Sequence, residues 1–105
     1  MKFGLSCEHI NMIANVLSNA NVVRAQVFGS RAKGNYKYNS DIDICLFGAV
    51  DNVEANRISE ELDELPMPYK FDVVSYNSIS APELREHIDR VGVDFYCNVN
   101  NGGGN

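Results

Sequence analysis

The chain has 105 residues, of which 45% are hydrophobic, so its size is that of one domain with a modest core. Its net charge of −5 argues against broad non-specific binding to DNA or RNA, because such affinity comes largely from Lys and Arg side chains that neutralise phosphates. No apolar run approaches the roughly 20 residues that cross a bilayer and no secretory signal is recognisable, so a cytoplasmic protein is expected, and three widely spaced cysteines favour neither disulfides nor a zinc site.

The first half of the chain predicts a helix followed by two strands. Ser6 can cap a helix whose apolar residues recur at the spacing of one helical face: Ile10, Ile13, Ala14 and Leu17. Residues 22–28 alternate apolar side chains and are rich in β-branched types, which predicts the first strand. Gly29 and Ser30 break this strand and open a short helical turn, after which residues 41–47, DIDICLF, form the second strand.

The second half predicts two more helices around a third strand. Asp51 caps a helix with an inward stripe that consists of Ala55, Ile58, Leu62 and Leu65. Residues 69–76 read as the third strand. Ser80 and Glu83 have the spacing of a capping box for the last helix, which Gly92 is expected to close.

The order of these elements predicts the fold class. Residues 93–99 are expected to form a last short strand or an irregular segment. Residues 1–98 are expected to make one domain, followed by a flexible tail over residues 99–105. Together the elements predict an α/β (α+β) fold with a small mixed β-sheet and helices packed on one face, so that the other face stays open.

Two aspartates in the second strand are the first candidates for a functional site. Asp41 and Asp43 are two residues apart, so they share one face of the strand, about 6.6 Å apart at about 3.3 Å per residue. In the third strand the same alternation turns Phe71 and Val73 to the core and Asp72 to the open face. If these strands are neighbours, three carboxylates converge.

Converging carboxylates repel one another unless a counter-charge is present. Oxygen ligands without His or Cys suit Mg²⁺, or alternatively Mn²⁺, which also takes phosphate oxygens from a substrate. A lone Asp-x-Asp is more often without function: Asp41 would then be an ordinary turn residue and Asp43 a solvated strand residue. The position of Asp72 and the upstream Gly29-Ser30 turn favour the metal site over that reading.

The stretch from Gly29 to Ile44, GSRAKGNYKYNSDIDI, resembles the signature of nucleotidyltransferases with a DNA polymerase β-like core: Gly-Ser, a spacer, Asp-x-Asp and a third Asp on a later strand. Its short form is most similar to the minimal nucleotidyltransferases, or MNT domains. The resemblance covers about residues 22–98. It implies that Gly29 and Ser30 hold the triphosphate of ATP.

The resemblance also assigns roles to the other candidates. It implies that Asp41 and Asp43 bind Mg²⁺ and that Asp72 completes the metal site and helps accept the proton of the incoming hydroxyl. Arg31 and Lys33 fit the family's basic tendency and are expected among the nucleotide-binding residues. The implied reaction is attack of an acceptor hydroxyl on the α-phosphate of ATP with release of pyrophosphate.

The acceptor is implied by the family and by the chain's length, which leaves no room for a separate acceptor-binding domain. Minimal nucleotidyltransferases are often paired with a small helical HEPN ribonuclease, so we expect an antitoxin that adds AMP to a tyrosine of a HEPN toxin. One alternative is a homodimeric enzyme that modifies a small alcohol such as an aminoglycoside. The other is a non-catalytic antitoxin that neutralises its partner by binding, which Asp43→Ala would distinguish from both enzymes.

Overall fold

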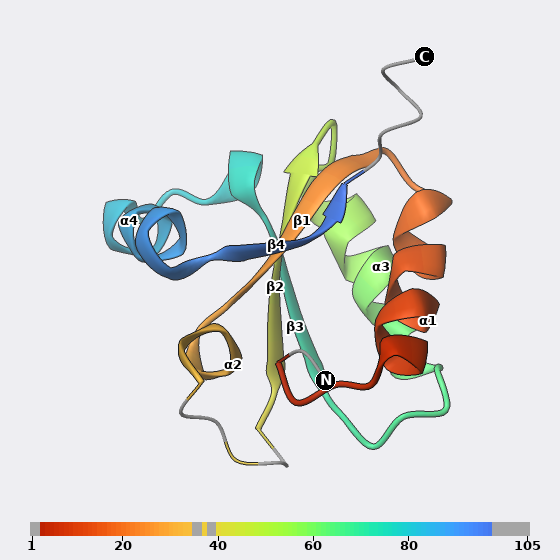
Figure 1. The fold of residues 1–105 in the computed structure, drawn as a ribbon. Coiled ribbons are helices and arrows are strands. Elements are labelled where there is room, and N and C mark those ends of the chain that lie inside the picture. The colour runs from red at the N-terminus through yellow and green to blue at the C-terminus, as the bar shows by residue number, and fades with distance from the viewer. Residues whose placement is uncertain (1–2, 35–36, 38–39, 98–105) are drawn as a thin grey trace.

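A computed structural model describes residues 3–34, 37 and 40–97 and contains a four-stranded sheet with helices (Figure 1). The elements follow in the order α1 (Cys7–Ser18), β1 (Val22–Phe28), α2 (Ser30–Lys33), β2 (Ile42–Gly48), α3 (Asn52–Asp63), β3 (Phe71–Ser75), a 3-10 turn η1 (Tyr76–Ser78), α4 (Pro82–Val91) and β4 (Val93–Cys97). Within the described ranges, no helix is both long enough and apolar enough to cross a membrane.

Helix caps explain where α1 and α3 begin. The Ser6 side chain accepts a hydrogen bond from the His9 N–H at 3.1 Å, and Asp51 Oδ1 accepts one from the Glu54 N–H at 2.9 Å. Each bond satisfies a backbone donor that the first helical turn leaves unpaired. Both caps confirm the sequence-based expectation.

The capping box predicted for α4 is wrong. The N-cap is Ala81, with no side-chain hydrogen bond, and Pro82 occupies the first turn. Proline favours the first helical position because its φ is fixed and it has no N–H to satisfy, so the helix starts one residue later than a Ser80 cap would require. Gly92 does end the helix, but with φ −65° its backbone is extended and not left-handed.

The sheet is mixed, as predicted, and has the strand order β3-β2-β1-β4. Strand β1 pairs with β2 and with β4 in antiparallel fashion, whereas β2 and β3 are parallel. The parallel connection between β2 and β3 passes through α3, as a crossover between parallel strands requires. The sequence left it open whether the segment after Gly92 is a strand or irregular, and the structure shows that Val93–Cys97 form the strand β4. The predicted tail lies outside the described residues.

One face of the sheet carries the main core. Helices α1 and α3 lie on this face (Figure 1). Most of the apolar positions that the sequence predicted to point inward, and the alternate residues of β2, are less than 4% exposed: Ile13, Leu17, Ile42, Ile44, Leu46, Ala55, Ile58 and Leu62. Three others of the predicted helical stripes, Ile10, Ala14 and Leu65, are half-buried. Because β2 alternates, the residues between its isoleucines point to the opposite face.

The opposite face is open only in part, contrary to expectation. A second cluster forms there around Phe28, Cys45 and Ile88, and α4 contributes Leu84 and Val91 to it. Figure 1 shows α4 on the side of the sheet away from α1 and α3. The end of this face that begins with Asp43 is left uncovered by α4 and is half-buried or exposed. That uncovered end carries the acidic residues.

Candidate active site

The strand register brings the predicted carboxylates together. In the parallel pair of β2 and β3, Asp43 lies opposite Asp72, while Ile42 lies opposite Phe71 on the core side. Asp41 immediately precedes β2 and is exposed, as is Asp72. The expectation that the second and third strands are neighbours, with Asp72 on the same face as Asp43, is confirmed.

Asp43 is the electrostatic centre of this group. Burial raises the pKa of the Asp43 carboxyl above its ordinary value of 3.8, and the charges of Asp72 and Asp41 raise this pKa further. The positive charge of Arg31 acts in the opposite direction and lowers it. The charges of Asp41 and Asp72 therefore act against the ionised form of Asp43, and Arg31 offsets this repulsion in part.

The donor set at this end of the sheet fits a hard divalent cation. It consists of carboxylate oxygens only, which Mg²⁺ and Mn²⁺ prefer over softer metals. In the described part of the chain, no three acidic, His or Cys side chains are already gathered closely enough to hold a metal ion. Asp41 and Asp72 are exposed, so their side chains can turn toward Asp43 without disturbing the core.

Gly29 brings backbone directly against the Asp43 carboxylate. Its φ of +76° and ψ of −150° lie in a region that essentially only glycine adopts. A Cβ atom at this position would be 2.3 Å from Asp43 Oδ2, far inside contact distance. Phe28, the residue before it, is paired with Asp43 across the antiparallel strands. The Gly-Ser turn and the Asp-x-Asp strand thus form one continuous surface.

Ser30 and Lys33 lie at the two ends of the four-residue helix α2 next to this surface. Ser30 is the first helical residue, so its N–H has no acceptor within the helix. The Ser30 carbonyl accepts the Gly34 N–H at 3.0 Å, which closes the turn. Lys33 is exposed. Both residues are accessible to a ligand that approaches the carboxylates.

Arg31 has a different environment from the one the sequence suggested. It is 2% exposed and donates hydrogen bonds to the carbonyls of Ser40 and Phe3. Its guanidinium also lies over the ring of Tyr69, 5.1 Å from the ring centre. The Arg31 side chain is therefore buried beneath the surface that carries the carboxylates, whereas the Lys33 side chain is exposed to solvent.

Lys70 is a basic residue of this surface that the sequence reading missed. The Lys70 carbonyl accepts the Ile42 N–H at 2.9 Å, which continues the β2–β3 register by one residue and places Lys70 beside Asp41. Since Phe71 points to the core, Lys70 lies on the acidic face and is exposed. Its spacing of two residues before Asp72 was the signal that could have identified it.

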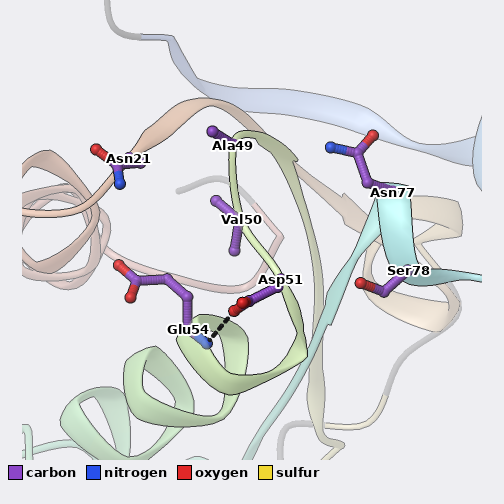
Figure 2. A pocket seen from close by; sticks show the side chains of 7 residues that line it. All are labelled: Asn21, Ala49, Val50, Asp51, Glu54, Asn77 and Ser78. Atoms are coloured by element: carbon purple, nitrogen blue, oxygen red, sulfur yellow. Dashed lines mark hydrogen bonds between the residues drawn. The ribbon is translucent and has the colours of Figure 1, made fainter.

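A polar pocket of about 430 Å³ lies at the other end of β2, remote from Asp43. Figure 2 shows Asn21, Asp51 and Asn77 around it. Asn77 Nδ2 donates to the Gly48 carbonyl at 2.7 Å, and Asp51 caps α3. These polar groups hold the loops that follow β2 and β3, and the lining of the pocket contains none of the predicted site residues.

Two comparisons by sequence find similar proteins. The family model described as polymerase beta, nucleotidyltransferase matches residues 11–101. A curated protein of Methanocaldococcus jannaschii, named as a candidate protein adenylyltransferase, is 38% identical over 84 residues, which are 78% of this chain and 88% of the relative. The range that the family model matches includes the Gly-Ser turn and the acidic strand.

Solved structures share the fold. A chain of a toxin–antitoxin complex with AMP-PNP superposes with a TM-score of 0.72 at 23% identity, covering 88% of this chain and 76% of the other. A chain of the complex between a tri-AMPylated HEPN toxin of Shewanella oneidensis and its MNT antitoxin gives a TM-score of 0.66 at 19% identity, covering 90% and 75%. At these identities the likeness concerns the fold.

Proposed function

Because this chain belongs to the polymerase beta nucleotidyltransferase family, we propose that it transfers AMP from ATP to a hydroxyl of a HEPN toxin and so acts as that toxin's antitoxin. The observation that carries the proposal is the register of β2 and β3, which sets Asp43 against Asp72 beside the Gly29 turn. A nucleotidyl transfer site needs this combination of metal ligands and a phosphate-contacting turn on one surface.

In the proposed reaction, an oxygen–phosphorus bond forms between the acceptor hydroxyl and the α-phosphorus of ATP. The bond from that phosphorus to the bridging oxygen of pyrophosphate breaks, and pyrophosphate leaves with the electron pair. The proton of the hydroxyl goes to a carboxylate, which we assign to Asp72 because it is exposed on the acidic face. The enzyme needs no covalent intermediate, so catalysis rests on positioning and charge stabilisation.

The other residues bind and orient the nucleotide. Asp41, Asp43 and Asp72 would hold Mg²⁺, which supplies neutralisation of the phosphate charge. Gly29 allows the triphosphate to approach the backbone, and Ser30 offers an N–H and a hydroxyl to phosphate oxygens. The exposed ammonium groups of Lys33 and Lys70 add positive charge at the same surface.

The acceptor class is taken from the relatives. The curated relative at 38% identity is named for adenylyl transfer to protein, and the shared fold includes chains of complexes in which a HEPN toxin carries AMP groups. A tyrosine is the proposed acceptor because its phenol presents an accessible hydroxyl of low pKa compared with serine or threonine.

Transfer to protein can be tested with ATP labelled at the α-phosphate, Mg²⁺ and a purified HEPN-domain protein as the acceptor. The proposal expects label and a mass gain of whole AMP units on that protein, on a tyrosine-containing peptide. Omission of Mg²⁺ or use of α,β-methylene-ATP should abolish both, since the latter cannot release pyrophosphate. Labelling of a small alcohol but not of the HEPN protein would instead indicate a nucleotidyltransferase that acts on small molecules.

Asp43→Ala tests whether catalysis is needed for neutralisation. The proposal expects this variant to lose both AMP transfer and protection of cells that express the toxin, because Asp43 stands at the centre of the acidic group. A folded Asp43→Ala protein that protects cells as well as the native chain would instead indicate an antitoxin that acts by binding alone.

A further inference from the structure

Arg31 is a buried charge close enough to the candidate site to lower the pKa of Asp43. Together with Ser75 it makes up the buried polar residues of the described chain, and Arg31 is the charged one. Burial of a cation is costly unless hydrogen bonds and nearby negative charge compensate for it. The segments that supply these compensating contacts to Arg31 are therefore informative.

The guanidinium joins segments that are distant in the sequence. Arg31 Nε and Nη2 donate to the Ser40 carbonyl at 3.3 and 2.9 Å, and Nη1 donates to the Phe3 carbonyl at 2.8 Å. The Tyr69 ring, two residues before β3, lies 5.1 Å from the guanidinium carbon and is contacted edge-on by His9. Arg31 thus touches the N-terminal segment, the residue before Asp41 and the approach to β3.

Arg31 and the residues that it contacts lie on the three segments that hold the candidate site. Arg31 itself follows Ser30, Ser40 precedes Asp41, and Tyr69 lies on the segment that leads to Asp72. The Ser40 hydroxyl in turn accepts the Lys37 N–H at 2.9 Å, which holds the turn before the strand. No backbone hydrogen bond recorded for the described residues links α2 directly to the start of β2, so the side chain makes the connection.

We propose that Arg31 is a positioning residue, which fixes the Gly29-Ser30 turn relative to Asp41 through the Ser40 carbonyl and does not contact the nucleotide. The effect of Arg31 on catalysis rests on the proposed nucleotidyl transfer, whereas its effect on the backbone geometry does not depend on that function. A lysine cannot replace it, because one ammonium nitrogen cannot reach the two carbonyls that the planar guanidinium bridges.

Arg31→Lys, which retains the charge, tests the proposal by two independent readouts. The first is hydrogen exchange of the Ile42 amide, which donates to the Lys70 carbonyl at 2.9 Å next to the Ser40 contact. Loss of the clamp should accelerate this exchange by about tenfold, as expected for local opening. Arg57→Lys is the matched control, since Arg57 is an exposed arginine of α3 paired with Glu54.

The second readout is the kinetics of AMP transfer. A positioning residue predicts that Arg31→Lys lowers kcat by about 100-fold while KM for ATP changes less than about threefold. Tyr69→Leu, which removes the ring and keeps the hydrogen bonds, should lower kcat in the same direction but less. If Arg31→Lys proves too unstable to assay, Tyr69→Leu provides the same test, because loss of the ring that packs on the guanidinium should loosen Arg31. A lower kcat with little change in KM would then support a positioning role, and a higher KM with unchanged kcat would contradict it.

Two results would overturn the proposal. A rise in KM for ATP with unchanged kcat would mean that Arg31 contacts the phosphates directly. Native exchange at Ile42 in a folded Arg31→Lys protein would mean that the clamp does not hold the strand. If the native chain transfers no AMP at all, the proposed function fails, and the exchange experiment still decides the role of Arg31.

Discussion

Gly29→Ala provides the sharpest test of the surface shared by the Gly-Ser turn and the acidic strand. Gly29 has φ +76°, and a Cβ atom there would be 2.3 Å from Asp43 Oδ2. The substitution therefore adds two separate penalties: a backbone conformation that alanine avoids, and a collision with the carboxylate at the centre of the site.

Each penalty has a magnitude. Backbone strain in a glycine-only region costs about 1–3 kcal/mol, which corresponds to a fall in melting temperature of roughly 4–8 °C per kcal/mol in a domain of this size. Real Cβ contacts are essentially never shorter than 3.0 Å, so the Asp43 carboxylate has to move by about 0.7 Å. Because a misplacement of about 1 Å can lower a rate by about 100-fold, we expect AMP transfer to fall by roughly 10- to 100-fold.

Gly34→Ala is the matched control. Gly34 lies at the other end of α2, has φ +88°, and a Cβ there would meet nothing within 4 Å. It should share the loss of melting temperature and retain activity. Thermal unfolding of the two variants and labelled AMP transfer below both melting temperatures separate strain from collision. Equal activities for folded Gly29→Ala and Gly34→Ala proteins would refute the contact between the turn and Asp43.

Three further predictions concern charge and accessibility. Asp43→Asn should raise the melting temperature of the metal-free protein at pH 7, because burial and neighbouring carboxylates raise the Asp43 pKa and ionisation of Asp43 therefore costs stability as the pH rises through that pKa. The gain in melting temperature should vanish as the pH falls toward 3.8, and a gain that is equal at every pH would contradict this origin. Lys70→Gln should raise KM for ATP about fivefold at low salt, the loss expected for about 1 kcal/mol of exposed charge interaction, and an unchanged KM would place Lys70 outside the site. A thiol reagent should modify the exposed Cys7 and Cys97 in the native protein, but Cys45 only after unfolding, because burial raises the Cys45 pKa to about 12. Rapid reaction of all three thiols in the native protein would show that α4 does not cover Cys45.

The sequence predicted the elements that depend on local pattern. The bounds of β1 were predicted at Val22 and Phe28, as observed, because alternation and the following glycine are both local signals. The side of β3 that carries Asp72 was also predicted, since the two-residue period of a strand fixes it once Phe71 is buried.

Features that depend on tertiary contacts were missed. The amphipathic pattern of α4 identifies an inward stripe around Ile88 but does not specify which face of the sheet it covers. The local sequence around Arg31 does not predict its burial, because the carbonyls that accept hydrogen bonds from its guanidinium belong to other segments. The two-residue alternation of β3 also indicates that Lys70 lies on the face of Asp72, so the position of this residue could have been predicted.

Asp41, Asp43 and Asp72 are expected to act on one divalent cation together with a nucleoside triphosphate, and Mn²⁺ titration followed by electron paramagnetic resonance measures this directly. With α,β-methylene-ATP present, the native chain should remove Mn²⁺ from the free signal, and Asp72→Asn, at an exposed position, should weaken this binding about tenfold or more without unfolding the protein. Equal Mn²⁺ affinity in the native chain and the variant, or no binding that depends on the nucleotide, would contradict a shared site.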